Sequence, residues 1–535
     1  MSVVLGFVFL AAIVVGAIVL ARALASKSQS VGADLVAYAL LAIFVGGLVW
    51  SLLLLARAAF PAPGLIGRGS QAELAGALAG IIVAGPVAYI LWRRQDKRRS
   101  EFPDSSGWSV YLALTDAVYL TWMVVYATQI LVALLGDGDF PRITDVLIIG
   151  GVVALHEWAS RVDQPGGNIS QIHRVVGSFI GLTTLAAGVG WILFWILDRI
   201  YSSFAATAGS SQLAVGVSLA LVGGVVWFVR WLTPWRQPAD GTKYTYLVLV
   251  VTGSLIAAVT AATALVVLVV VYLLDQPDSP AQHFEAVPGI LAVLATAFLV
   301  WFHHRPGFGE QRNDAERAYQ YLTAAIGLGT AIGAGTALGR ILSETDSLID
   351  NVAAAGISLV IVFAVGAVVW WLFWSEAQAA PRTEEAASLP RKFYVIGLAV
   401  ILGLVTAGAV VGVLLYIFQS LFGLDPQPST LATELTLAVL AGAATFHLIT
   451  QNRADSELRD KPGSRPYQLT VICSHPGPLA SRLSKEATLR IIHRGDGVGT
   501  ITDEMADAIV EQTRGFDSII WVDQDSFQSV PALHN

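Results

Sequence analysis

The chain has 535 residues, of which 55% are hydrophobic and only 13% are charged. This composition is too apolar for a set of soluble domains and indicates a protein that crosses a membrane many times. A net charge of −7 excludes the basic footprint of a nucleic-acid-binding protein, and the single cysteine, Cys473, excludes an internal disulfide framework.

An apolar segment at the N-terminus, residues 3–24, is long enough to cross a bilayer. It follows an uncharged Met-Ser, so it lacks the basic region of a secretory signal, and no small-residue cleavage site clearly follows it. The sequence therefore predicts a retained transmembrane helix within residues 1–30.

Residues 31–455 repeat one unit six times: a long apolar helix, a turn, and a second apolar helix. The first helices open, in steps of 73, 63, 72, 75 and 73 residues, at Tyr38-Ala39, Tyr111-Leu112, Arg174-Val175, Tyr246-Leu247, Tyr321-Leu322 and Tyr394-Val395. The second helices end on the aromatic residues Trp92, Trp158, Trp227 with Trp231, Trp301, Trp370 with Trp374, and Phe446. Such a period predicts six tandem helical hairpins, and the N-terminal helix brings the total to about thirteen crossings.

The orientation of the hairpins follows from the basic residues of the short loops, because cytoplasmic loops retain Lys and Arg. The connections between hairpins and at their two ends carry 22 basic residues, whereas the turns inside hairpins carry 5. The bias places the N-terminus outside and the C-terminus in the cytoplasm. All six hairpins then enter the membrane in the same sense, so they are parallel repeats rather than the inverted repeats of many transporters.

The second hairpin carries the polar residues that suggest chemistry inside the membrane, where ionisable groups are costly and often functional. Asp116 has only apolar equivalents in the other hairpins, namely Ile43, Phe179, Val251, Ile326 and Ala399. Gln129 follows on the same helix, and His156 and Glu157 lie on the return helix. This candidate intramembrane polar site could relay protons or hold a cation. In the alternative, Asp116 pairs with a loop arginine while His156 and Glu157 reach the membrane interface.

Other repeated residues have simpler interpretations. Tryptophans at helix ends are expected to anchor the chain at the membrane interface. His303, His304 and His447 close return helices and are expected at the same interface, without metal-ligand spacing. Glycines at four-residue spacing are expected to let helices approach closely; they include Gly177, Gly181, Gly327, Gly329, Gly333, Gly335, Gly339, Gly408 and Gly412.

A polar linker, residues 456–465, leads to a small soluble α/β domain, residues 466–535. Alternation and turn residues predict strands over Leu469–Cys473, Leu489–His493, Ser518–Val522 and Phe527–Val530, and helices over Leu479–Glu486 and Asp503–Thr513. The glycines between Gly495 and Gly499 precede the second helix, but Asp503 occupies the place of a bound phosphate, which favours a helix cap by Thr500 instead. The domain has a net charge of −4, so it is not expected to bind an anionic membrane face.

The tandem hairpins with Tyr-Leu openings and closing segments such as Val369-Trp370-Trp371-Leu372-Phe373-Trp374 resemble a bacterial membrane domain of unknown function, number 5671. That domain is a four-helix unit, so the resemblance implies about three copies between Ala33 and about Thr450. It implies no catalytic residues, because the family has no assigned activity. Hairpin three departs from the pattern at His173-Arg174. An arginine-rich, lysine-poor composition also suggests a bacterial source.

The sequence thus predicts an all-α polytopic protein of the bacterial plasma membrane with a small cytoplasmic α/β domain. Our first hypothesis is a membrane scaffold or sensor coupled to that domain; the alternative is a channel or transporter that uses the second hairpin, and a membrane-embedded enzyme comes third. We expect the lipid bilayer and possibly a protein partner of the C-terminal domain as partners. We expect no nucleic acid, no cofactor and no bound metal.

Overall fold

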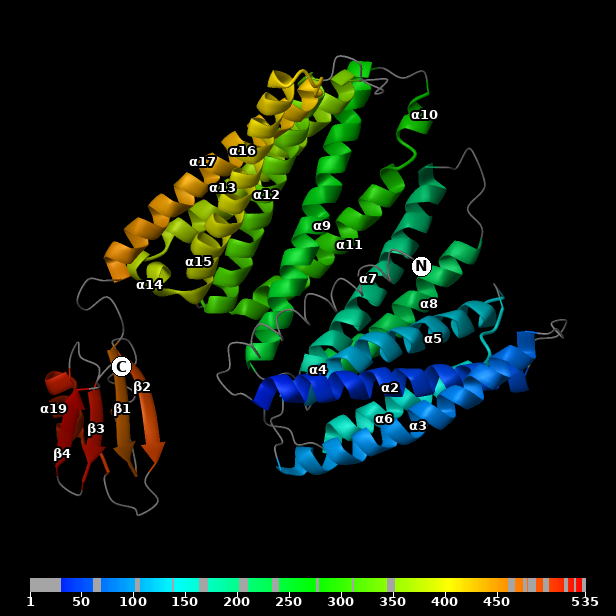
Figure 1. Cartoon of the computed structure of the whole chain (residues 1–535), viewed down its shortest axis with the longest axis horizontal. Helices are drawn as coiled ribbons and strands as arrows, with labels where there is room; N and C mark the ends of the chain where they lie inside the picture. Colours follow the sequence, from blue (N-terminus) through cyan, green and yellow to red (C-terminus); the bar gives the residue numbers. More distant parts are fainter. Residues whose placement is uncertain are drawn as a thin grey trace. The chain divides into compact units, whose positions relative to one another are not determined.

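The structure is a computed structural model that describes most of the chain. The described residues are 30–60, 69–101, 106–136, 139–162, 172–201, 210–232, 240–275, 279–309, 312–343, 352–459, 467–474, 479, 487–493, 500–513, 518–523 and 526–531. The predicted N-terminal helix and most of the predicted linker lie outside them. The chain forms two compact units, Met1–Tyr319 and Gln320–Asn535 (Figure 1).

Eleven helical spans among the described residues are long and apolar enough to cross a membrane, judged by length and composition. They are Ala37–Ala59, Leu74–Lys97, Tyr111–Leu134, His173–Tyr201, Gln212–Trp231, Lys243–Leu274, Pro280–Phe308, Asp314–Ser343, Val352–Ala379, Leu389–Leu421 and Pro428–Leu458. The eleven do not include α6 (Ile143–Val162), which the sequence analysis counted as a crossing. The chain has the helices of a multi-pass membrane protein, and the count of thirteen stays a prediction.

The first unit holds the helices of the first four predicted hairpins. Their bounds are α2 (Ser30–Ala59), α3 (Gly69–Glu101), α4 (Ser106–Thr115), α5 (Thr121–Leu134), α6, α7 (Ile172–Tyr201), α8 (Ser210–Trp227), α9 (Asp240–Asp275), the short α10 (Pro280–His283) and α11 (Val287–His304). Two π-helical turns interrupt this series: η1 (Asp116–Leu120) joins α4 to α5, and η2 (Phe228–Leu232) ends α8.

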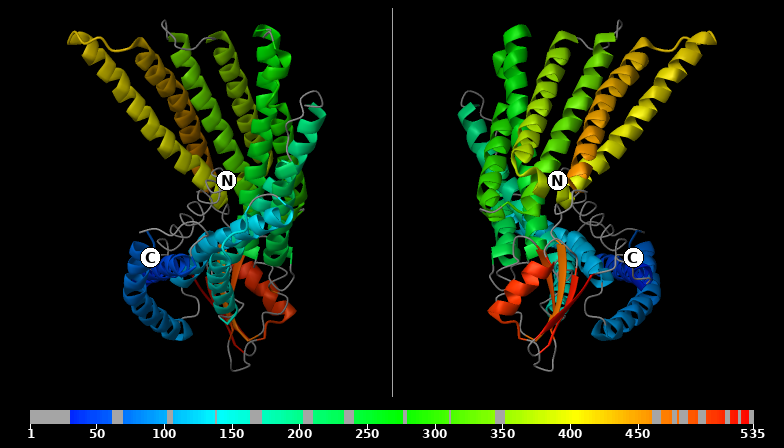
Figure 2. Two further views of the ribbon diagram at one scale, coloured as in Figure 1. Left: turned by 90° about the vertical axis from the view of Figure 1, so that its right-hand side faces the viewer. Right: turned by 90° about the vertical axis from the view of Figure 1, so that its left-hand side faces the viewer.

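The second unit holds four long helices and the C-terminal domain. The helices are α12 (Asp314–Ser343, which begins in the first unit), α13 (Val352–Ala379), α16 (Leu398–Leu421) and α17 (Pro428–Arg459), and they lie side by side in Figures 1 and 2. Two short helices, α14 (Arg382–Ala387) and α15 (Leu389–Lys392), and a π turn, η5 (Phe393–Gly397), connect α13 to α16. Helix α17 continues four residues into the segment expected to be linker.

The same helix contacts recur in three successive groups of four. The first helix of each group packs against the second and the fourth: α2 against α3 and α6, and α7 against α8 and α11. In the third group α12 meets α13 at Gly327 and Gly366, and meets α17 at Gly335 and Gly339. One arrangement of packed helices is therefore used three times along the chain.

Glycines set the closest of these contacts. A Cβ atom on Gly327 would lie 2.6 Å from the backbone nitrogen of Trp370, and one on Gly181 would lie 2.5 Å from that of Trp227. Among the predicted packing glycines, Gly335, Gly339 and Gly412 are also in close contact with a neighbouring helix, and Gly177 with an arginine side chain. The expectation was wrong for Gly329, Gly333 and Gly408, which face open space. Spacing alone does not say which side of a helix meets a neighbour.

The C-terminal domain has the predicted α/β structure. Its sheet has the order β2-β1-β3-β4, with β1 (Tyr467–Cys473) parallel to β2 (Ala487–His493) and β3 (Ser518–Val522), and β4 (Phe527–Pro531) antiparallel to β3. Helix α19 (Asp503–Thr513) packs on one face of this sheet. Its cap is Thr502, whose hydroxyl accepts a hydrogen bond from the backbone N–H of Met505 at 3.3 Å, so the expectation of a cap by Thr500 was wrong. The predicted helix Leu479–Glu486 lies mostly outside the described residues.

Cys473 ends β1 inside the core of this domain. Its side chain is fully buried beside Leu469, Val471 and Ile509. Burial raises the pKa of the Cys473 thiol, because the thiolate would lose its hydration. The thiol therefore behaves as a small apolar core residue.

Candidate functional site

His156, one of the four predicted site residues, is buried in the first unit with 3% of its surface exposed. Its Nδ1 lies 2.8 Å from the carbonyl oxygen of Val152, and its Nε2 lies 2.7 Å from the hydroxyl of Tyr111 on α4. A carbonyl only accepts, so Nδ1 carries the hydrogen and Nε2 accepts from the tyrosine hydroxyl. The rings of Trp92 and Tyr119 lie 6.1 Å from the imidazole, centroid to centroid. His156 is thus buried inside an aromatic cluster, with both ring nitrogens within hydrogen-bond distance of a partner.

A second Tyr–His pair occupies the matching place in the next group of helices. The hydroxyl of Tyr246 lies 3.3 Å from Nε2 of His304, whose Nδ1 lies 2.9 Å from the carbonyl oxygen of Val300. Trp227 donates its indole N–H to the same hydroxyl at 2.9 Å. His304 has 4% of its surface exposed, so its side chain is buried among the helices of this group.

The third group has the same tryptophan–tyrosine hydrogen bond as the second group, but its histidine makes different contacts. Trp370 donates its N–H to the hydroxyl of Tyr394 at 3.1 Å. The ring of His447 packs edge-on against Trp370 and Trp374, with centroids 6.0 and 5.8 Å away. Trp370 and Trp374 therefore contribute to packing inside the protein, and their role as interface anchors stays a prediction. Exposed tryptophans suited to anchoring are Trp158 and Trp371, with 61% and 59% of their surface exposed.

Glu157 is held by an arginine from another hairpin. Its Oε2 lies 2.8 Å from Nη1 of Arg230 in η2, an ion pair by distance rather than by a well-aligned hydrogen bond. The side chain of Arg230 crosses α7 at Gly177, where a Cβ atom would lie 3.1 Å from its Nε. Gly177 therefore makes room for a buried arginine, and the ion pair joins α6 to the end of α8.

The other two predicted residues lie apart from this pair. Gln129 is half-buried on α5, thirteen residues beyond Asp116, which corresponds to about 20 Å along a helix. Asp116 is the first residue of the π turn η1, and its side chain lies outside the described part of the structure. The structure brings His156 and Glu157 together only as chain neighbours, with different partners.

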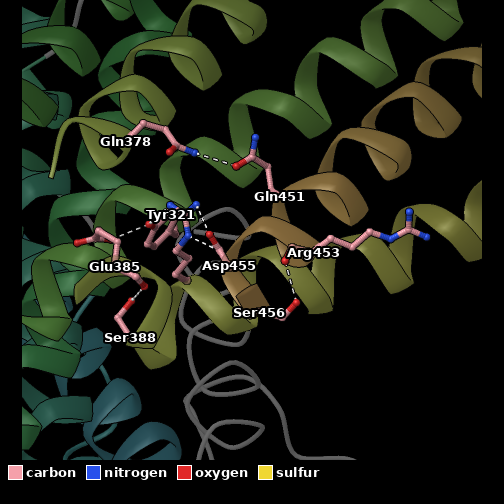
Figure 3. Close-up of polar contacts among 9 residues, drawn as sticks. Tyr321, Gln378, Glu385, Ser388, Gln451, Arg453, Asp455 and Ser456 are labelled. Carbon is pink, nitrogen blue, oxygen red and sulfur yellow. Dashed lines mark hydrogen bonds and ion pairs between the residues drawn. The ribbon is translucent and has the colours of Figure 1, made fainter. Parts of the chain in front are cut away.

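A buried ionic network in the second unit was not found from the sequence. We call it the Arg391 network, and its members are Arg391, Asp455, Tyr321 and Glu385 (Figure 3). Arg391 has 1% of its surface exposed and binds Asp455 through two hydrogen bonds, Nε to Oδ2 at 2.6 Å and Nη2 to Oδ1 at 3.0 Å. Its Nη1 donates to the hydroxyl of Tyr321 at 3.2 Å, and this hydroxyl donates to Oε2 of Glu385 at 2.7 Å.

The network fastens five elements at the end where α12 begins and α17 ends. Tyr321 comes from α12, Glu385 from α14, Arg391 from α15 and Asp455 from α17, and the ring of Trp374 on α13 lies 5.3 Å from the guanidinium carbon. A planar guanidinium suits this arrangement, because it binds a carboxylate with two hydrogen bonds and stacks on an aromatic ring. The chemistry is that of a structural clamp: each of its charges is engaged inside the protein.

The Arg391 network is not predictable from the sequence, because no single member stands out from its neighbours. Arg391 counted as one of the basic residues of a cytoplasmic loop, and Asp455 closed the helical region next to the predicted linker. They are 64 residues apart. One difference between the groups is visible in the sequence. The residue three positions before the tyrosine of each third helix is Arg391 in the last group, but Trp108 and Lys243 in the first and second groups.

The family model of a domain of unknown function (DUF5671) matches two segments, residues 33–160 and 317–446. The chain carries two copies of this domain. The first DUF5671 copy contains the Tyr111–His156 pair, and the second contains Tyr321, Glu385 and Arg391 but ends before Asp455. The group α7, α8, α9 and α11, with its Tyr246–His304 pair, lies outside both DUF5671 matches. No curated protein and no solved structure matches the chain.

Proposed function

We propose that the chain is a scaffold or sensor of the bacterial plasma membrane, in which about thirteen crossings, arranged as six parallel hairpins, carry a cytoplasmic α/β domain. The observation that supports this function best is that three ionisable side chains buried near helix ends each have a partner on another helix. His156 is bound by Tyr111, Glu157 by Arg230, and Asp455 by Arg391. A transport path needs polar groups that bind and release a substrate, whereas these groups fix helices to one another.

The connection between α17 and the C-terminal domain supports a coupling role. Asp455 lies four residues before the end of α17 at Arg459, and β1 of the domain begins at Tyr467. The Arg391 network therefore fixes the last turns of the helix that leads into the domain. A rearrangement of α12, α14 or α15 would change the exit of α17, which is how a helical array would report its state to a cytoplasmic domain.

Trypsin tests the orientation and the coupling together, because the Arg459–Asp460 bond is a cleavage site between α17 and β1, whereas Lys461 and Arg465 each precede a proline, where trypsin does not cut. We expect cleavage of the full-length chain in inside-out vesicles and protection in right-side-out vesicles. Asp455→Ala is expected to speed cleavage at Arg459 about tenfold relative to cleavage at Arg514 in the C-terminal domain, because losing one partner of a buried ion pair loosens the helix end. Mass spectrometry of the released fragment measures the ratio.

The matched control is Glu457→Ala, which removes an exposed carboxylate from the same turn of α17. It should leave the cleavage ratio unchanged. Cleavage only in right-side-out vesicles would reverse the orientation, and equal effects of the two substitutions would remove the coupling role of the Arg391 network.

The second candidate function is a channel or transporter that uses the second hairpin. It is favoured by the π turn that begins at Asp116, since π turns inside helices often accompany functional sites. The apolar equivalents in the other hairpins indicate that Asp116→Val should assemble normally. Under the scaffold proposal we expect Asp116→Val and Asp116→Asn to keep membrane yield, thermal stability and cell phenotype. Normal stability with a lost phenotype would favour transport.

A further inference from the structure

The densest group of basic residues in the chain lies at the C-terminal end of α3. We call it the α3 basic cluster, and its members are Arg93, Arg94, Lys97, Arg98 and Arg99. With the two acidic residues of the same segment, Asp96 and Glu101, residues 93–101 carry a net charge of +3, whereas the whole chain carries −7. Helix α3 continues through this segment to Glu101, so the cluster is part of the helix that crosses the membrane.

One side of α3 faces the protein. Four side chains with at most 6% of their surface exposed follow one another at spacings of 7, 4 and 7 residues and form a single stripe: Ala77, Ala84, Ala88 and Gln95. The stripe meets α2, where a Cβ atom on Gly47 would lie 3.6 Å from that of Ala84. Next to the cluster, Trp92 packs edge-on against Trp108 with ring centroids 5.9 Å apart. Packing therefore fixes the inward side of the last turns of α3 (Figure 1).

The other side of α3 is apolar and then basic. Helical spacing places its residues in two neighbouring rows: Ile82, Tyr89, Arg93 and Lys97, and beside them Val83, Ile90 and Arg94. The apolar members have between 61% and 71% of their surface exposed, and the basic members are exposed as well. The guanidinium carbon of Arg93 lies 6.0 Å from the ring centroid of Tyr89. The basic side chains thus continue the surface that faces lipid.

The length of the apolar part matches one leaflet of a bilayer. Eleven residues separate Ile82 from Arg93, which corresponds to about 16 Å along a helix. The hydrocarbon core of a bilayer is about 30 Å thick, so the acyl chains of one leaflet cover about 15 Å. With Ile82 at the middle of the membrane, Arg93 and Arg94 lie at the level of the phospholipid phosphates.

Arg93 and Arg94 form no ion pair within the part of the chain that the structure describes. Four arginines in other connections between hairpins, by contrast, each lie within 3.0 Å of a carboxylate: Arg230, Arg305, Arg317 and Arg391. Those arginines are neutralised by the protein itself. The exposed guanidinium groups of α3 can instead bind an anion from the surrounding membrane.

We propose that this side of α3 binds an anionic phospholipid, with its phosphate on Arg93 and Arg94 and its acyl chains along Ile82 and Ile90. A guanidinium group binds a phosphate with two parallel hydrogen bonds. Four to eight basic residues directly after a membrane helix are typical of anionic-lipid binding. The lipid site is independent of the scaffold role and of the orientation, because it needs only that α3 crosses a bilayer.

Photoreactive lipids test this binding. The full-length chain is placed in vesicles of phosphatidylcholine and phosphatidylglycerol, with a trace of either lipid carrying a diazirine on its acyl chain close to the glycerol. Light releases nitrogen from the diazirine, and the resulting carbene inserts into a nearby C–H or O–H bond. We expect the phosphatidylglycerol probe to label the segment from Tyr89 to Arg94 at least about tenfold more than the phosphatidylcholine probe. Peptide mass spectrometry locates and quantifies the adducts.

Substitutions show whether the two arginines cause the preference. Each basic side chain near an anionic surface favours binding about fivefold, so Arg93→Gln with Arg94→Gln should lower labelling by the phosphatidylglycerol probe at least about tenfold. Arg93→Lys with Arg94→Lys keeps the charge and should retain most of the labelling. The matched control, Arg382→Gln with Arg453→Gln, removes two exposed arginines elsewhere and should leave the labelling of α3 unchanged.

Three results would overturn the lipid site. Equal labelling of α3 by the two probes in the parent chain would do so without any substitution, and would leave an acidic protein segment as the partner of the α3 basic cluster. Full labelling of the double glutamine variant would show that the arginines are not involved. An equal loss in the control variant would show that only the total charge of the chain matters.

Discussion

Replacing Arg391 with methionine is expected to destabilise the helices of the second unit by about 3–5 kcal/mol, because the substitution leaves a buried carboxylate without its cation. Asp455 has 3% of its surface exposed and both its oxygens bind Arg391. The loss should appear as a lower thermal unfolding temperature in detergent and a lower yield of folded protein. Methionine keeps much of the apolar length of the arginine side chain, so the loss of stability measures mainly the removal of the positive charge.

The double substitution Arg391→Met with Asp455→Leu removes both charges and should recover most of the lost stability. Arg453→Met is the matched control, since Arg453 is an exposed arginine two residues from Asp455 on α17. It should change stability by no more than about 0.5 kcal/mol. Equal losses for Arg391→Met and Arg453→Met, or a double variant no more stable than the single one, would contradict the clamp role of the network.

Gly327→Leu is expected to be the most damaging substitution on α12. A Cβ atom at this position would lie 2.6 Å from the backbone nitrogen of Trp370 and 2.9 Å from the carbonyl oxygen of Gly366. Backbone atoms cannot rotate away, so α12 and α13 would have to separate, at a cost of about 3 kcal/mol or more. Thermal stability in detergent and the yield of folded protein measure this loss.

The control for this prediction is on the same helix. Gly329→Leu places the same side chain two residues away, where nothing lies within 4 Å. It should be neutral or stabilising by about 0.5–1 kcal/mol, because leucine loses less backbone entropy than glycine in a helix. If both variants were equally unstable, the close approach of α12 and α13 at Gly327 would be wrong.

The candidate site was only partly accessible from the sequence. The cost of burying charge pointed to hairpin two, where the structure places His156 beside Tyr111 and Glu157 beside Arg230; that these residues form a functional site stays a prediction. Their partners, Tyr111 and Arg230, could not be predicted, because the first is 45 residues away and the second belongs to another hairpin. The Arg391–Asp455 pair could not be predicted for the same reason. Charge and spacing in the sequence indicate which groups need a partner, but they do not identify the partner.

The sequence by itself determined the local structure. Apolar runs of about 20 residues specify membrane helices wherever they occur, and the alternation in Ser518–Val522 and the pattern in Asp503–Thr513 gave a strand and a helix with the bounds that the structure has. The repeated openings such as Tyr321-Leu322 also identified the domain family. These features depend only on residues close together in the chain.

Tertiary structure decided which face of each helix is used. A soluble helix shows its buried side as an apolar stripe, but a membrane helix is apolar all round, so its sequence does not say how it is rotated against its neighbours. Gly327 and Gly329 look alike in sequence, yet one touches the backbone of α13 and the other faces open space. Arg391 lies over Trp374 because tertiary packing fixes how α15 meets α13.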